Sequence, residues 1–97
     1  MKIVNNKKKF LVAQLSLEEA RKLGWGDICD NCNELMTKER FFIPVLGRRC
    51  LCKKCFDEWL AGATRFEEDI PYEEREWDRF LDECIYSGVI IDRHADD

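Results

Sequence analysis

The sequence has little of what most enzymes use for catalysis. Its one histidine, His94, lies in a polar C-terminal stretch, where a general base is not expected. Its five glycines form neither a phosphate-binding loop nor a nucleophile elbow. Acidic residues are plentiful, but we expect Glu73, Glu74 and Glu76 on an exposed helix face without a pocket to perturb them. These absences favour a protein that is not an enzyme.

Long apolar runs are also missing. No stretch approaches the roughly 20 apolar residues of a membrane-spanning helix, and residues 1–15 lack an apolar run of signal-peptide length. We therefore expect a cytoplasmic protein whose six cysteines are metal ligands or buried thiols, and we disfavour a secreted disulfide scaffold. The length of 97 residues, without an internal repeat, predicts a single domain, residues 1–97, with one modest core.

Charge is distributed unevenly along the chain. Residues 1–60 carry twelve Lys or Arg against eight Asp or Glu, a balance of +4, whereas residues 61–97 carry four against twelve, a balance of −8. Together they give the net charge of −4. The acidic last third fits an arm that engages a basic partner, and it also fits an ordinary solvated helix face.

Four of the six cysteines form two Cys-x-x-Cys pairs, Cys29 with Cys32 and Cys52 with Cys55, separated by nineteen residues. A two-residue gap lets a tight turn aim both sulfurs at one point, about 2.3 Å from a metal ion. Two such pairs complete a tetrahedron of thiolates with no open position, which is typical of structural zinc. The spacing predicts one structural Zn²⁺ bound by these four residues.

The residues before the first pair, 1–26, predict a strand and a short helix. The apolar run at 8–13 is typical of a strand. Ser16 and Glu19 form a capping box at a helix start, and Gly24 stands where a left-handed residue ends a helix. Trp25 is expected to pack over the junction with the metal-binding segment.

The next segment, 27–63, predicts a metal-binding module. The stretches 38–45 and 48–52 indicate a β-hairpin. Because Pro44 cannot donate to a sheet, its strand is expected to be an edge strand or to bulge. A helical pattern begins at Lys53 and places the second cysteine pair at a helix start, where exposed backbone N–H groups favour thiolate over thiol.

The last segment, 64–97, predicts a connector and a C-terminal amphipathic helix. Pro71 suits the first turn of that helix and Gly88 its end. Residues 89–91 form a short strand or a packed tail, and residues 93–97 are expected to fray. Apolar residues recur at helical spacing on one face and are expected in the core: Trp77, Phe80, Leu81, Cys84 and Ile85.

The order of knuckle, β-hairpin and helix resembles the treble-clef zinc finger. The resemblance rests on Cys29-Asp-Asn-Cys32 and Cys52-Lys-Lys-Cys55-Phe56 and is confined to the central module. It implies a small α+β, zinc-stabilised, treble-clef-like domain with one zinc ion. The helix start is also similar to RING-type and LIM-type modules, but those use eight ligands, and only Cys50, Cys84 and His94 remain here. The resemblance therefore implies no ubiquitin-ligase activity.

Cys50 is an alternative third ligand because it shares a strand face with Cys52. We favour a buried core thiol for Cys50, since Cys52 alone stands at knuckle spacing from Cys55. Core packing is likewise expected for Cys84.

The function that fits these patterns is a small non-enzymatic binding or adaptor module whose partner is another protein, with no membrane partner. Nucleic acid is an alternative partner, although a pI near 5.1 argues against it. Its basic patch would comprise Arg48, Arg49, Lys53 and Lys54. A less favoured alternative is thiol–disulfide exchange at Cys52 and Cys55, which lacks a βαβ setting and leaves the other pair redundant. The sequence leaves the oligomeric state open.

Overall fold

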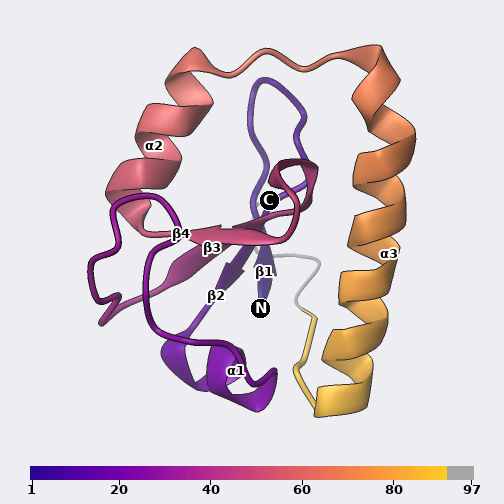
Figure 1. The fold of residues 1–97 in the computed structure, drawn as a ribbon. Coiled ribbons are helices and arrows are strands. Elements are labelled where there is room, and N and C mark those ends of the chain that lie inside the picture. The colour runs from indigo at the N-terminus through magenta and orange to yellow at the C-terminus, as the bar shows by residue number, and fades with distance from the viewer. Residues whose placement is uncertain (92–97) are drawn as a thin grey trace.

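The structure is a computed structural model that describes residues 1–91; His94 and the stretch expected to fray lie outside the described residues. A four-stranded antiparallel sheet, in the order β1–β2–β3–β4, separates helix α2 from helix α3 (Figure 1). The strands are β1 (Lys2–Ile3), β2 (Ala13–Leu15), β3 (Arg40–Ile43) and β4 (Arg49–Leu51). The helices are α1 (Leu17–Lys22), α2 (Lys53–Gly62) and α3 (Ile70–Ser87), with 3₁₀ turns η1 (Pro44–Leu46) and η2 (Glu67–Asp69). The expected α+β class is confirmed.

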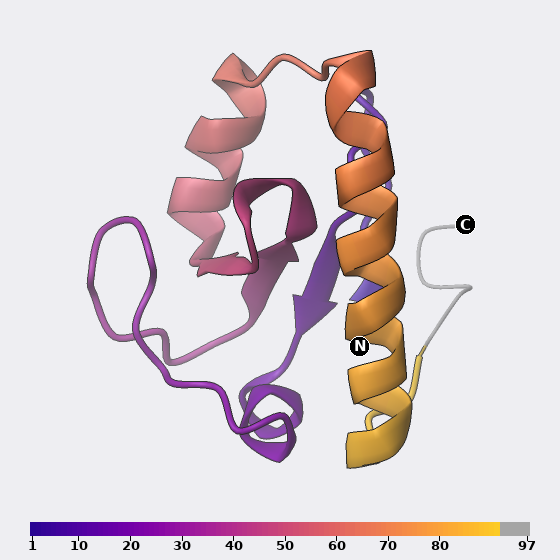
Figure 2. The same cartoon turned by 45° about the vertical axis from the view of Figure 1, so that its right-hand side comes forward.

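The sheet is the middle of three layers, with α2 against one face and α3 along the other (Figure 2). Strand β3 is buried along its whole length because both faces are covered. Phe41 and Ile43 join the hydrophobic cluster that contains Phe56 of α2, whereas Phe42 joins the cluster that contains Phe80 of α3. The apolar residues therefore fill two layers instead of the one core that we expected.

The N-terminal segment follows the prediction only in part. Ser16 and Glu19 form the predicted capping box, and Gly24 has the positive φ, 77°, of a helix end. The strand predicted at 8–13 is wrong. Lys9 has a left-handed φ of 65°, and the side chain of Asn6 accepts a hydrogen bond from the Phe10 N–H at 3.0 Å, so this stretch turns. Strand β2 begins only at Ala13.

The central hairpin, β3 with β4, is confirmed, and so is the helix that begins at Lys53. The prediction of an edge or bulged strand at Pro44 is wrong, because β3 lies between β2 and β4. The chain leaves the sheet at Pro44 and enters η1, where the missing N–H removes no bond of the ladder.

Helix α3 has Pro71 in its first turn and ends at Gly88, which has a φ of 78°. The N–H of Val89 donates to the Cys84 carbonyl at 2.8 Å, a bond of the Schellman type, so the buried Val89 begins a packed tail and not a strand. Trp77, Phe80 and Cys84 are buried as predicted, and Leu81 is half-buried. Ile85 is not in the core: its side chain is 70% exposed.

Two carboxylates predicted to be exposed are buried instead. Glu73 is 1% exposed; it accepts hydrogen bonds from Arg65 at 2.9 Å and from the Leu11 N–H at 3.1 Å. Glu76 is 6% exposed and accepts from Arg79 at 3.2 Å. Both charges are tolerated because each has a cationic partner. Among the described residues, no helix combines the length and the apolar character needed to cross a membrane.

Candidate metal centre

The first cysteine pair lies in a tight loop that precedes β3. The N–H of Cys29 donates to the Glu34 carbonyl at 2.9 Å, and the Asn33 N–H donates back to the Cys29 carbonyl at 3.0 Å. Asn33 has a left-handed φ of 63°, a conformation that asparagine tolerates better than most residues. The turn that places Cys32 close to Cys29 is therefore encoded by local residues.

The second pair lies where β4 passes into α2. Cys52 is the N-cap residue of the helix, and its carbonyl accepts from the Phe56 N–H at 2.9 Å. Cys55 is in the first turn of α2 and is buried with Phe56. The Cys52 N–H donates to the sulfur of Cys29 at 3.4 Å, which joins the two pairs directly.

The structure brings all four predicted cysteines together. Their Sγ atoms all lie within 4.8 Å of one another, and those of Cys32 and Cys52 are 4.0 Å apart. A tetrahedron with metal–sulfur bonds of about 2.3 Å has sulfur–sulfur edges of about 3.8 Å. The sulfurs need to move by only about 1 Å to reach that geometry. The cluster can thus hold a metal ion with four sulfur ligands.

The thiols of the cluster differ in acidity. Burial by itself raises the pKa of Cys29, but backbone N–H groups of Cys32, Cys52 and Asn31 outweigh it and lower the pKa to about 6. For Cys32 the backbone at Glu34 lowers the pKa, yet burial and the three neighbouring thiols raise it to about 12. Without a cation, Cys29 is therefore a much stronger acid than Cys32.

The expectation that the helix start favours thiolate is wrong for Cys52. The backbone N–H of Cys55 does lower the pKa of Cys52, but burial and the adjacent thiols of Cys55 and Cys29 give a net increase. A cation between the sulfurs would reverse this balance, because it compensates the mutual repulsion of thiolates.

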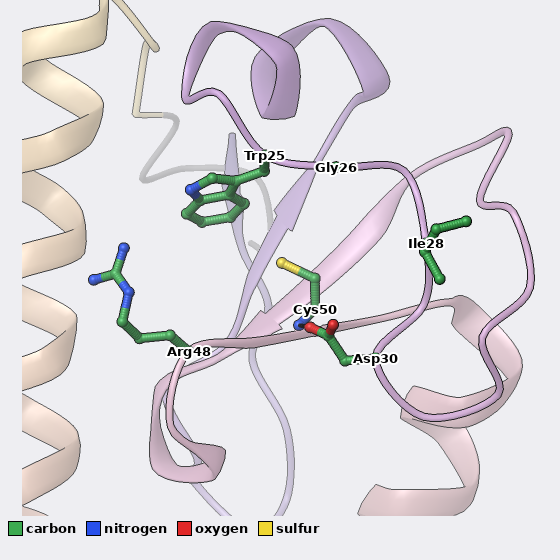
Figure 3. Close-up of a pocket in the computed structure, with 6 residues that line it drawn as sticks. All are labelled: Trp25, Gly26, Ile28, Asp30, Arg48 and Cys50. Carbon is green, nitrogen blue, oxygen red and sulfur yellow. Dashed lines mark hydrogen bonds between the residues drawn. The ribbon is translucent and has the colours of Figure 1, made fainter.

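Cys50 lies apart from the four clustered sulfurs. Its sulfur lines a hollow of about 310 Å³ together with Trp25, Ile28 and Arg48 (Figure 3). Cys50 is half-buried and packs against both hydrophobic clusters, and burial raises its pKa to about 12. Cys84 is buried on α3 and is also outside the sulfur cluster.

The backbone of Cys50 has a role that the sequence did not reveal. Its N–H donates to Oδ2 of Asp30 at 2.8 Å, and its carbonyl accepts from the Asp30 N–H at 3.0 Å. Asp30 stands between the first two cysteines, so this pair of hydrogen bonds joins their loop to β4. Asn31 adds a donor to the sulfur of Cys55 at 3.3 Å.

Arg40 is a second residue whose role the sequence did not reveal. It is fully buried in β3 and donates to the Gly26 carbonyl at 2.8 Å and to Asp27 at 3.3 Å. A buried arginine requires such partners. The contacts fix the chain where it enters the first cysteine loop. The sequence signal for a buried arginine was the position of Arg40 directly before the apolar run at 41–43.

Two of the four predicted basic residues, Arg48 and Lys53, are paired with acidic residues. Arg48 extends towards α3, as Figure 3 shows, and pairs with Glu83 at 2.6 Å. Lys53 pairs with Asp57 at 2.7 Å. Arg49 and Lys54 are exposed. Lys8 donates to the carbonyls of Leu60 and Ala63 at 2.6 Å each and so caps the end of α2.

Comparisons with known proteins assign no family to this chain: no protein-family model matches it, and neither does any curated protein or solved structure.

Proposed function

We propose that this protein is a zinc-binding module in which Cys29, Cys32, Cys52 and Cys55 hold one structural Zn²⁺. The observation that carries the proposal is the convergence of four sulfurs, from two separate segments, within 4.8 Å. An all-sulfur, four-ligand set is the donor chemistry of structural zinc, although iron accepts the same set. Four protein ligands leave no position for a substrate, so the ion has no catalytic role.

The position of the sulfurs supports a structural role. Cys29 and Cys55 belong to the hydrophobic cluster on the α2 side of the sheet, so a bound ion would join the first loop to the start of α2. Structural zinc contributes about 10 kcal/mol or more to the folding of small modules. The observed order of loop, β3–β4 hairpin and α2 supports a treble-clef-like class for this part of the chain.

We further propose that the module is non-enzymatic, acts in the cytoplasm and binds another protein. The internal pairing of Arg48, Lys53 and Lys8 supports a protein partner over nucleic acid, because paired cations are less available to phosphates. The raised pKa of Cys52 disfavours thiol–disulfide exchange at the helix start, since that chemistry needs an accessible thiolate.

The test of the metal site is native mass spectrometry of untagged protein, which gives metal identity and stoichiometry together. We expect one zinc ion per chain. Cys52→Ser should abolish stoichiometric zinc, and Cys50→Ser, the matched control, should keep it. If Cys52→Ser retained zinc and Cys50→Ser lost it, Cys50 would be the ligand and Cys52 would not. A metal-free native sample, or one with the four sulfurs in disulfides, would overturn the proposal.

A direct measurement can separate the two classes of partner. Binding of mixed-sequence DNA and RNA oligonucleotides is measured at low and at moderate salt. We expect no binding at low salt. Affinity that falls steeply with added salt would favour the nucleic-acid alternative, because it reports the release of counterions from phosphates.

A further inference from the structure

The C-terminal end of α3 exposes side chains of a kind that helices usually bury. Tyr86 is 95% exposed, and Ile85 is 70% exposed. Both share a helix face with Asp82, because residues three and four positions apart are neighbours on a helix. Leu23, at the end of α1, lies beside Tyr86. We call these four residues, Leu23, Asp82, Ile85 and Tyr86, the Tyr86 surface.

The Tyr86 surface borders a hollow of about 440 Å³. Leu23 and Tyr86 contribute its apolar wall, and Asp82 and Glu83 contribute carboxylates. Glu83 is paired with Arg48, whereas Asp82 forms no ion pair or hydrogen bond within residues 1–91. An apolar depression with an unpaired charge at its rim has the layout of a docking site, in which an apolar anchor is surrounded by polar contacts.

We propose that the Tyr86 surface docks a basic segment of another protein. An aliphatic or aromatic side chain of that segment enters the hollow between Leu23 and Tyr86, and a neighbouring Lys or Arg pairs with Asp82. Charge complementarity favours this occupant, because residues 61–91 carry three Arg against nine Asp or Glu, a balance of −6. The inference rests on the protein-binding part of the proposed function and names the chemistry of its partner.

Charge also argues against a second copy of this chain as the occupant. A two-fold interface places the same patch of both copies face to face. Asp82 of each copy would then face acidic residues of the other, and Asp78, one turn earlier on α3, adds a further exposed carboxylate. Like charges that approach without a compensating cation oppose association.

The experiment uses a phage-displayed library of random 12-residue peptides, selected on the full 97-residue protein as purified. We expect enriched peptides to combine Lys or Arg with an aliphatic or aromatic residue. The best peptide is then synthesised with a fluorophore and its affinity measured by anisotropy. Tyr86→Ala should weaken binding at least about tenfold, since aromatic anchors dominate such interfaces. Asp82→Asn should weaken it about fivefold and reduce its salt dependence.

Phe66→Ala is the matched control. Phe66 is also an exposed aromatic residue, but it precedes the start of α3, and the helix from Ile70 to Tyr86 is about 24 Å long. Its substitution should leave the affinity unchanged. Failure to enrich basic peptides, or equal affinity of Tyr86→Ala and wild type, would overturn the proposal. So would a dimer in sedimentation that Tyr86→Ala dissolves, because a second copy would then be the occupant.

Zinc content, measured on the same samples, separates this proposal from the metal site. Tyr86→Ala should keep one zinc per chain, because Tyr86 is distant in sequence from all four cysteines and packs against none of them. Intact zinc without peptide binding would reject the Tyr86 surface alone. Absent zinc with peptide binding retained would reject the metal site alone.

Discussion

Removing the carboxylate of Glu73 is expected to destabilise the fold far more than removing that of its neighbour Glu74. Glu73 is 1% exposed and accepts from Arg65 and from the Leu11 N–H. A hydrogen bond to a charged group contributes about 1.5–3 kcal/mol, and a part-buried donor left without a partner costs about 1–3 kcal/mol. Glu73→Ala should therefore lower the free energy of unfolding by about 3 kcal/mol.

Urea unfolding of the metal-loaded protein, followed by circular dichroism, measures this loss. With a slope of about 1.5 kcal/mol per molar urea, a loss of about 3 kcal/mol moves the midpoint down by about 2 M. Glu73→Gln keeps an acceptor for the Leu11 N–H and should lose about half as much. Glu74 is exposed, so Glu74→Ala should stay within about 0.5 kcal/mol of wild type. Equal midpoints for Glu73→Ala and Glu74→Ala would refute the reasoning.

Two further predictions concern proton linkage and the end of α2. Because the pKa values of Cys32 and Cys52 are raised, both hold protons near neutral pH, and each zinc ion should release at least two protons at about pH 7.5. The metal-free form binds more protons, so zinc affinity should fall on acidification, by at least about 100-fold per pH unit and more steeply below about pH 6, where Cys29 also takes up a proton. Titration calorimetry in buffers of different ionisation enthalpy checks this, and release of fewer than two protons would contradict it. Lys8→Met removes the cap of α2 and should cost about 1–2 kcal/mol, seen as a lower melting temperature. The exposed Lys7→Met is its control, and an equal melting temperature for both variants would exclude the capping role.

Features that depend on neighbouring residues could be predicted from the sequence. The capping box of Ser16 and Glu19 lies within one helical turn, and Gly88 ends α3 because glycine readily adopts a positive φ. The convergence of the four cysteines was also predictable, although their pairs are far apart. Each pair carries its own spacing signal, and the predicted hairpin between them brings the pairs together.

Features that depend on distant segments could not be predicted. Glu73 has the spacing of an exposed helix residue, but Leu11 and Arg65, which lie outside its helix, approach its carboxylate. Strand β1 has two residues and exists because β2 pairs with it, so it has no periodicity of its own. The central position of β3 could not be predicted either, because one of its two neighbours, strand β2, comes from far earlier in the chain.

The sheet divides the molecule into two flanks, and the sulfur cluster belongs to only one. Cys29 and Cys55 sit in the flank under α2, whereas the flank under α3 is filled by Phe42, Trp77 and Phe80 without any of the four. Removal of the metal by a chelator should therefore unfold the flank under α2 and leave the flank under α3 folded. In this partly unfolded chain, Phe41 would become accessible to proteases and chaperones, whereas Trp77 would keep the fluorescence of a buried side chain. The metal-free species that proteases and chaperones encounter would then be a partly folded intermediate rather than a random coil.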